Sequence, residues 1–334
     1  MTHPSQPSTP SPDPDNMAAW QQLLNQQLPE DQALALLQSP ASQDPTLNQL
    51  LSLHQLLWQR MQAWPDTPPL PQPLFDCCGT GGDGSNSLNI STAVAVVAAA
   101  AGAAVAKHGG GAASSKSGSL NVLQSLGVVL PETAAQAAQQ LTSHRLSFLP
   151  APLFHPSLKP LATLRKQVGR PTIFNLLGPL LNPTRPRFQL LGVYDATKLE
   201  LMARALQRLG VQRAWVVHGQ DGLDELSLGA INSVIEVTPT QLRAFELDAG
   251  SLGLPPTPKT ALLGGTPEEN AAAMQQLLAG QRGAYRDAVC LNSAAALVIC
   301  GLAKDLPSGL TAAYAALDSG AANRLLSQLR LPPH

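Results

Sequence analysis

Two segments rich in glycine and serine carry the residue types that suit an anionic ligand. Residues 79–92 read GTGGDGSNSLNIST, and residues 107–119 read KHGGGAASSKSGS. Glycine has no Cβ atom, so its backbone N–H group can approach a ligand closely. A helix is expected to start at the end of each segment, and the free N–H groups there attract phosphate. The pattern is neither a P-loop nor a Rossmann GxGxxG motif. We interpret the segments as phosphate-binding loops, with ordinary surface turns as the alternative.

A pair of adjacent carboxylates forms a second candidate centre. Asp224 and Glu225 follow the apolar run RAWVVH at residues 213–218. Taken alone, such a pair is typical of a solvated surface. Beside a diphosphate it would hold Mg²⁺, a hard cation that prefers oxygen ligands and bridges to phosphate. Asp83, in the first loop, could help to organise that site or brace its own loop.

Two histidines and one arginine are further candidates for chemistry. His108 follows Lys107 at the start of the second loop, and His155 lies in APLFHPS. A lone histidine is more often structural than catalytic. Arg165 could be an ordinary surface residue, like its neighbour Lys166.

Alternating strands and helices are expected to position these residues. Short apolar runs predict strands at 74–78, 103–107, 189–194, 213–218 and 233–237. Apolar periodicity predicts helices at 92–101, 120–126, 197–209, 267–278 and 287–301. This alternation indicates a mostly parallel sheet covered on both faces. Both glycine-rich loops then lie at the carboxyl ends of strands, where open α/β sheets bind ligands.

The rest of the chain divides by composition. Residues 1–16 are rich in Pro, Ser and Asp and predict a disordered tail. Residues 17–64 have helical apolar spacing and predict a small helical domain, which part of 160–185 is expected to join. Residues 65–73, PDTPPLPQP, predict a stiff linker. Residues 74–330 then form the α/β domain.

Composition argues against several classes of protein. The 334 residues include 21 Lys and Arg against 22 Asp and Glu, so the basic surface that nucleic acid requires is not expected. No signal peptide is visible, and the longest apolar run is too short to span a membrane. The cysteines lack metal-site spacing and are expected to be buried, reduced thiols in a cytoplasmic protein. They are Cys77, Cys78, Cys290 and Cys300.

Five segments, in this order, resemble the anthranilate phosphoribosyltransferase family. They are GTGGDGSNSLNIST, KHGGGAASSKSGS, FHPSLKPLATLRKQVGRPTIFNLLGPLLNP, VVHGQDGLDELS and GGTPEENAA. The resemblance implies a small helical domain and a large α/β domain of the nucleoside phosphorylase/phosphoribosyltransferase type, paired as a homodimer. It implies transfer of phosphoribose from 5-phosphoribosyl 1-diphosphate to the amine of anthranilate, in tryptophan biosynthesis, with Mg²⁺.

The resemblance also implies which residues form the site. Those implied for phosphoribosyl diphosphate are Gly79, Gly82, Asp83, Ser87, Asn89, Ile90, Ser91, Thr92, Lys107, His108, Gly109, Gly110, Ser114, Ser115 and Ser119. Those implied for anthranilate are Gly79, Gly110 and Arg165, whose planar guanidinium suits a carboxylate. Those implied for magnesium are Ser91, Asp224 and Glu225. His108 and His155 are candidates for accepting the amine proton, and no strong general base is assigned.

The second loop departs from the family pattern at two positions. The family usually reads KHGNR, whereas residues 107–111 read KHGGG. The asparagine expected at Gly110 normally contacts the aromatic substrate, and the arginine expected at Gly111 is also absent. This leaves three alternatives to the enzyme: a paralogue with another aromatic amine as acceptor, a nucleoside phosphorylase, and a non-catalytic homologue that binds the ligand.

Overall fold

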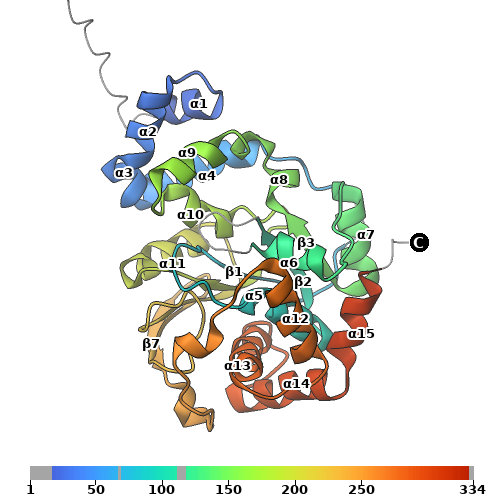
Figure 1. The fold of residues 1–334 in the computed structure, drawn as a ribbon. Coiled ribbons are helices and arrows are strands. Elements are labelled where there is room, and N and C mark those ends of the chain that lie inside the picture. Colours follow the sequence, from blue (N-terminus) through green and yellow to red (C-terminus); the bar gives the residue numbers. More distant parts are fainter. Residues whose placement is uncertain (1–16, 67–68, 111–117, 331–334) are drawn as a thin grey trace, which may run out of the picture.

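The structure, a computed structural model, describes residues 17–66, 69–110 and 118–330 (Figure 1). The tail predicted at 1–16 lies outside the described residues, as does part of the predicted linker. Gly111, Ser114 and Ser115 also lie outside them.

A seven-stranded sheet in the order β3-β2-β1-β4-β5-β6-β7 forms the centre of the molecule. The strands are β1 (Leu74–Gly79), β2 (Ala104–Gly109), β3 (Leu146–Pro150), β4 (Phe188–Gly192), β5 (Arg213–Gly219), β6 (Asn232–Val237) and β7 (Leu242–Leu247). The first five strands are mutually parallel, and β6 and β7 are antiparallel additions. The prediction of a mostly parallel sheet is confirmed, although β3 and β7 were not predicted.

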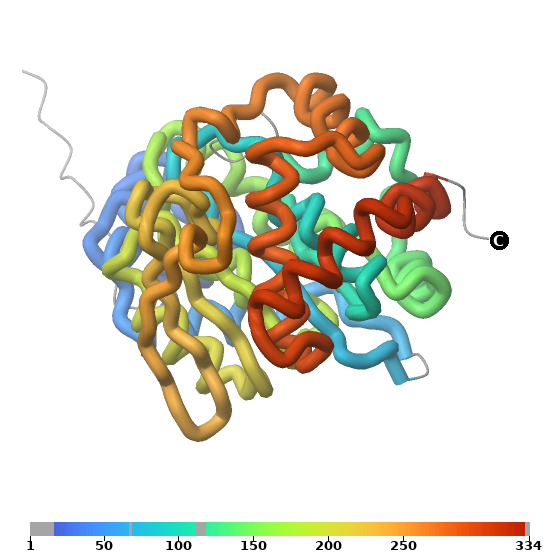
Figure 2. Tube along the Cα trace, turned by 90° about the horizontal axis from the view of Figure 1, so that it is seen from below, coloured from blue at the N-terminus to red at the C-terminus, as the bar shows by residue number. Residues whose placement is uncertain are grey.

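Helices cover both faces of the sheet (Figures 1 and 2). The α-helices are α1 (Met17–Leu24), α2 (Glu30–Gln38), α3 (Pro40–Gln43), α4 (Leu47–Gln59), α5 (Ile90–Ala100), α6 (Ser119–Ser125), α7 (Ala134–His144), α8 (Ala151–Phe154), α9 (Leu161–Val168), α10 (Ile173–Leu177), α11 (Leu199–Arg208), α12 (Pro267–Leu278), α13 (Ala284–Ile299), α14 (Leu306–Asp318) and α15 (Ala321–Gln328). The 3-10 turns are η1 (Pro156–Leu158), η2 (Gly178–Leu180), η3 (Ala196–Lys198), η4 (Ala249–Leu252) and η5 (Lys259–Leu262). Observed bounds differ from the predicted ones by a few residues at element ends. The helix predicted at 197–209, for example, is η3 followed by α11.

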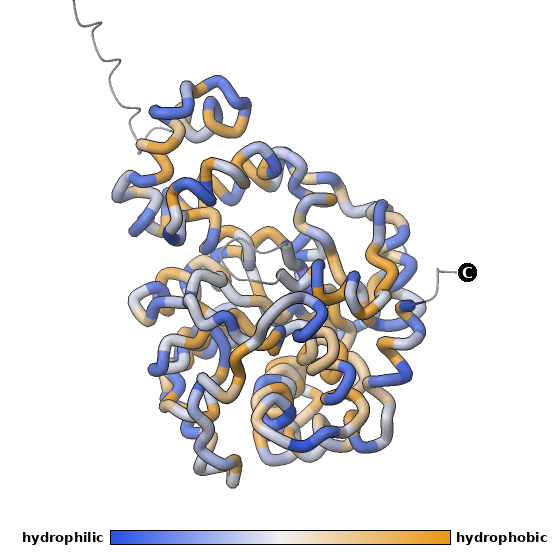
Figure 3. The backbone as a smooth tube through the Cα atoms, in the orientation of Figure 1, coloured by the Kyte–Doolittle hydropathy of each residue, from blue (hydrophilic) through white to orange (hydrophobic). Residues whose placement is uncertain are grey.

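The two faces of the sheet pack into separate hydrophobic clusters because successive strand residues point in opposite directions. Leu190 and Trp215 belong to the cluster that includes α5 and α12–α15. Leu191 and Val216 belong to the cluster that includes α1, α2, α4 and α9–α11. In Figure 3, helices at the periphery alternate between hydrophilic and hydrophobic residues, as helices with one buried face should.

The strand order places a topological switch point between the carboxyl ends of β1 and β4. After β1 the chain continues to β2 and β3 on one side, whereas β4 leads to β5 on the other. Loops after β1 and β4 therefore leave the sheet in opposite directions, and ligands bind at such switch points in open α/β sheets. Gly79 and Gly192, which end the two strands, are partners in the register.

The structure also bears on the cysteines and on membrane-spanning helices. The four cysteines are buried free thiols, as predicted. Among the helices of the described residues, none combines the length and apolar character that crossing a membrane requires.

Candidate active site

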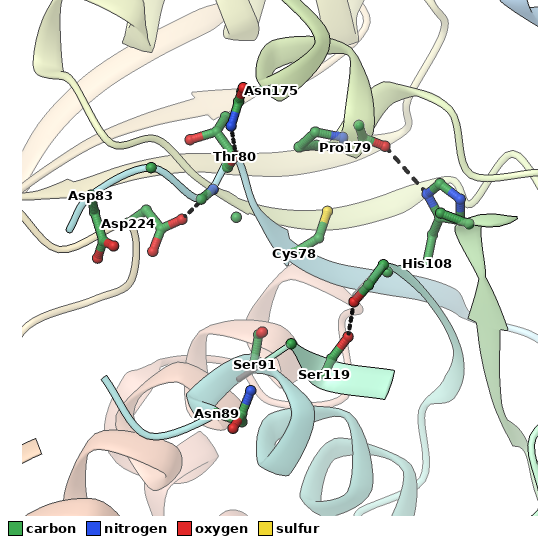
Figure 4. A pocket seen from close by; sticks show the side chains of 18 of the residues that line it. Cys78, Thr80, Asp83, Asn89, Ser91, His108, Ser119, Asn175, Pro179 and Asp224 are labelled. Carbon is green, nitrogen blue, oxygen red and sulfur yellow. Dashed lines mark hydrogen bonds between the residues drawn. The ribbon is translucent and has the colours of Figure 1, made fainter. Parts of the chain in front are cut away.

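One pocket of about 340 Å³ lies at the carboxyl ends of β1 and β2, between the first glycine loop and the segment from α8 to η2 (Figure 4). Every described residue that the sequence analysis placed in the site lines it. These residues are Gly79, Gly82, Asp83, Ser87, Asn89, Ile90, Ser91, Thr92, Lys107, His108, Gly109, Gly110, Ser119, His155, Arg165, Asp224 and Glu225. The structure thus brings together residues from four distant parts of the chain, while their contacts with substrates stay a prediction.

The first glycine loop joins β1 to the amino end of α5. Gly81, Gly82 and Gly84 have φ values of 61°, 84° and 65°, which residues with a Cβ rarely adopt. Asn89 is the N-cap of α5, and its side chain makes no capping hydrogen bond. The loop therefore brings the amino end of a helix to the pocket, an arrangement that attracts anions.

The acidic pair lies directly against this loop. Gly81 N donates to Asp224 Oδ2 at 2.8 Å, and Ser91 N donates to Glu225 Oε1 at 3.2 Å. Burial raises the pKa of Asp224 to about 7, with the charge of Asp83 as a second cause. Burial, followed by the charge of Asp224, raises the pKa of Glu225 to about 8. Three carboxylates therefore crowd one corner of the pocket.

The donors in this corner fit a divalent cation. Asp83 Oδ2 is buried and has no hydrogen-bond partner among the described residues. All the donors are oxygen atoms, which Mg²⁺ prefers. The described residues contain no group of three or more His, Cys, Asp or Glu side chains that could hold a metal ion.

Two glycines make room for the acidic pair. A Cβ atom on Gly192 would lie 1.5 Å from the carbonyl oxygen of Asp224, and one on Gly79 would lie 2.2 Å from Asp224 Oδ2. Neither distance is possible for real atoms. The acidic loop can therefore rest on the switch point only because β1 and β4 both end in glycine.

Replacing Gly192 with alanine should destabilise the protein by about 3 kcal/mol, because the backbone of Asp224 must move away from the sheet. Chemical denaturation would measure the loss. Gly110→Ala is the matched control, since among the described residues its Cβ would meet only Ala151 Cβ, at 3.9 Å. Equal stability of the two variants would contradict the close packing of the acidic loop on β4.

A buried polar network, which sequence reasoning missed, lies beneath the residues that line the pocket. Lys107 Nζ donates to the carbonyl oxygen of Cys77 at 2.8 Å. Asp76, fully buried, accepts from Asn182 Nδ2 at 2.8 Å and from His108 N at 3.3 Å. Burial raises the pKa of Asp76 to about 6, against the opposing charge of Lys107. A lone aspartate inside an apolar strand was the only sequence signal for this network.

The two pocket histidines are neutral hydrogen-bonding groups. His108 Nδ1 lies 3.3 Å from the carbonyl oxygen of Gly178, and His155 Nε2 lies 2.8 Å from that of Leu181. A nitrogen that bonds a carbonyl carries the proton, so the other ring nitrogen is an acceptor. Those acceptors, His108 Nε2 and His155 Nδ1, are buried without a partner among the described residues. Burial lowers both pKa values, that of His108 to about 3, so neither ring is a strong base.

Arg165 brings a half-buried positive charge to the same end of the pocket. Its Nη2 donates to Asn175 Oδ1 at 3.3 Å, and its guanidinium carbon lies 5.9 Å from the Phe174 ring centroid. Burial lowers its pKa. No ion pair among the described residues includes it. A cation in this state suits the carboxylate of a ligand. Asn175, which also donates to Thr80 O at 3.2 Å, is a further residue that sequence reasoning missed.

Known proteins resemble this chain over most of its length. The family described as "Glycosyl transferase family, a/b domain" matches residues 71–323. The anthranilate phosphoribosyltransferase of Lacticaseibacillus paracasei is 41% identical over 317 residues, covering 94% of this chain and 92% of that protein. The one from Myxococcus xanthus is 48% identical over 262 residues, or 78% of each chain.

Solved structures agree with these relatives. The crystal structure of anthranilate phosphoribosyltransferase from Thermus thermophilus has a TM-score of 0.84 at 38% identity, covering 94% of each chain. The Saccharomyces cerevisiae enzyme in complex with PRPP and Mg has a TM-score of 0.77 at 25% identity, covering 94% of this chain and 96% of that one.

The fold, the pocket and the family match define the class of protein: a glycosyltransferase whose α/β domain makes up most of the chain. The relatives and the neighbouring structures narrow the class further. The chain belongs to the anthranilate phosphoribosyltransferase family.

Proposed function

We propose that the protein transfers the phosphoribosyl group of 5-phosphoribosyl 1-diphosphate to the amine of anthranilate, giving N-(5-phosphoribosyl)anthranilate and diphosphate. The observation that carries the proposal is a pocket lined by a glycine loop, a carboxylate pair and an arginine that has no acidic partner among the described residues. The relatives' names support the anthranilate reaction and do not favour the alternatives.

The sugar diphosphate belongs at the glycine loop in this proposal. The backbone N–H groups of residues 79–92 and the start of α5 would hold the diphosphate, and Ser119 would extend the contact from the second loop. The bond from C1 to the diphosphate oxygen breaks through a transition state with oxocarbenium character, as in glycoside chemistry. Fixed donors aimed at the leaving oxygen stabilise the negative charge that develops there.

Mg²⁺ is the proposed cofactor. Asp224, Glu225 and the hydroxyl of Ser91 would hold it, since the donors of this corner fit a hard cation. When bound, it supplies positive charge that offsets the charge of the diphosphate. The yeast relative with PRPP and Mg supports this choice.

Anthranilate is proposed to bind at Arg165. The guanidinium would pair with the carboxylate, and the free acceptors His108 Nε2 and His155 Nδ1 would face the amine N–H groups. Such contacts orient the amine toward C1, and orientation supplies much of the rate enhancement of a two-substrate reaction. The nitrogen forms its bond to C1 as the bond from C1 to the diphosphate breaks, and its proton passes afterwards to solvent or to the departing diphosphate, because both imidazoles are weak bases.

The proposal is tested by following anthranilate fluorescence with purified protein, phosphoribosyl diphosphate and MgCl₂. Anthranilate should be consumed only when all components are present, and the chain should restore growth of a tryptophan auxotroph that lacks this step. Sugar diphosphate binding without consumption of anthranilate would overturn the proposed acceptor.

Gly110→Asn should raise kcat/KM for anthranilate by up to about tenfold, the value of one added hydrogen bond. A Cβ atom at this position would lie 3.9 Å from Ala151 Cβ, an ordinary van der Waals contact. Steady-state kinetics with Gly110→Ala as the control would measure the gain. Unchanged or slower turnover would show that the missing asparagine is not a lost substrate contact in this chain.

The domain arrangement, assembly and location are further proposals. Residues 17–64 with part of 160–185 would form the helical domain, which is supported by the cluster that α1, α2 and α4 share with α9 and α10. Two copies would pair through this domain, and residues 74–330 would form the α/β domain. The free cysteines support a reducing, cytoplasmic location.

A further inference from the structure

The motif GGTPEEN at residues 264–270 has no part in the proposed reaction, yet it lies against the first glycine loop. Leu88 N donates to Leu262 O at 2.8 Å, and Gly264 N donates to Asn86 O at 2.8 Å. Ser87 and Leu263 form a β-bridge between these hydrogen bonds. The motif therefore braces the loop from outside the pocket.

The side chain of Asn270 connects this brace to Asn89. Asn270 is 2% exposed and lies in the first turns of α12. Its Oδ1 accepts from Gly265 N at 2.8 Å, and its Nδ2 donates to Asn89 Oδ1 at 3.0 Å. A Cβ on Gly264 would lie 2.7 Å from Asn270 Oδ1, so the amide can sit here only beside a glycine.

These contacts fix which atom of Asn89 faces the pocket. The backbone N–H of Gly265 can only donate, so the atom of Asn270 beside it must be the oxygen. The amide nitrogen of Asn270 then faces Asn89 and requires an oxygen there. Asn89 Nδ2 is left on the pocket side, as Figure 4 shows. Tyr285 holds the backbone of the same residue, since its hydroxyl donates to Asn89 O at 3.2 Å.

We propose that Asn270 is a positioning residue that sets the amide of Asn89 with its N–H donors toward the sugar diphosphate. The inference rests on the proposed function, because it assigns the anion that Asn89 meets. A reversed Asn89 amide would present an oxygen to that anion, replacing an attraction with a repulsion. Two hydrogen bonds of 3.0 Å or less connect the backbone N–H of Gly265 to the amide of Asn270, and the amide of Asn270 to that of Asn89 at the pocket.

The test is a double-mutant cycle between Asn270→Leu and Asn89→Ala. Leucine has the shape of asparagine but neither donates nor accepts, and it adds no charge near the diphosphate. Asn270→Leu should raise the KM for phosphoribosyl diphosphate about tenfold, the value of one hydrogen bond to a charged group, with the KM for anthranilate within about twofold. In the Asn89→Ala background, the same substitution should change KM by less than about twofold.

The double-mutant cycle distinguishes an Asn270 that acts by positioning Asn89 from one that only stabilises the fold. An equal rise of KM in both backgrounds would overturn the inference, because it would mean that Asn270 acts independently of Asn89. Gln140→Leu is the matched control for losing a buried amide, since Gln140, on α7, donates to Val129 O at 2.8 Å. It should lower Tm and leave KM unchanged. If Asn270→Leu does not fold, Asn270→Ser completes the same cycle.

Calorimetric titration with phosphoribosyl diphosphate and MgCl₂ distinguishes this inference from the proposed function. If the protein binds the sugar diphosphate but does not consume anthranilate, the proposed function fails. The double-mutant cycle then uses the Kd for the sugar diphosphate in place of its KM, with the same expected changes. If the unmodified protein does not bind the sugar diphosphate, both are overturned.

Discussion

Arg165→Met is expected to raise the KM for anthranilate about a hundredfold and to leave the KM for phosphoribosyl diphosphate within about twofold. Removing one partner of a buried charge pair typically costs at least about 2–5 kcal/mol, which gives an effect of this size. The same substitution should leave Tm unchanged or raise it. In the free protein the half-buried guanidinium donates a 3.3 Å hydrogen bond to Asn175 and pairs with no carboxylate among the described residues, so an apolar side chain of similar length relieves part of a desolvation cost.

Steady-state kinetics and thermal melting on one preparation check both halves of this expectation. Lys166→Met is the control, because Lys166 is the exposed neighbour on α9 and should affect neither quantity. A large fall in Tm without a change in KM would mean that Arg165 supports the fold and does not bind the acceptor.

Glu225→Gln is expected to lower kcat/KM for phosphoribosyl diphosphate about a thousandfold at saturating Mg²⁺. A metal ion that stabilises a leaving group supplies several kcal/mol, and each ~1.36 kcal/mol is tenfold in rate. Glutamine keeps the shape and the acceptor oxygen for Ser91 N but removes the negative charge that would hold the cation. Glu246→Gln, on the exposed side of β7, is the control for losing one carboxylate.

Although Glu225→Gln should lower activity, it should make the protein more stable at high pH in the absence of metal. The pKa of Glu225 is raised from 4.5 to about 8, so the fold favours the protonated form. The stability that this preference provides is present below about pH 4.5 and is lost as pH rises through about 8. Glutamine cannot ionise, so the variant should melt at a higher temperature than the unmodified protein, with a gap that widens from about pH 4.5 to about pH 8 and stays constant above that. Melting curves in EDTA would measure it, and a constant gap would contradict the burial of an ionisable Glu225.

The sequence predicted the parts of the fold whose local pattern is strong. Apolar runs followed by glycine-rich loops marked β1 and β2, and apolar periodicity marked α12 with the bounds that it has in the structure. Strand β3 was missed because it is a five-residue run bounded by a helix and a proline. Strand β7 was missed because its alternating charged residues lie at the edge of the sheet, where burial does not select apolar side chains.

Within the site, residue types were predictable and partners were not. The motif order pointed to Asp224 and Glu225, but nothing local showed that they would accept from backbone groups over 130 residues away in the chain. Asp76 and Asn270 escaped notice because their roles are set by contacts across the fold. Lys107 illustrates the same limit, since its ammonium donates to Cys77 O beneath the pocket, which no spacing rule indicates.

The hydrogen bond from Ser91 N to Glu225 has a consequence for the order in which the ligands affect one another. In the free protein, the first-turn amide of Ser91 on α5 already donates to the side chain of Glu225, which therefore takes the position that an external anion would occupy. One N–H cannot serve both this carboxylate and an incoming diphosphate at full strength. A cation that drew Glu225 away would free the amide, so we expect metal and sugar diphosphate each to strengthen the binding of the other. By thermodynamic reciprocity, the two factors of enhancement are equal.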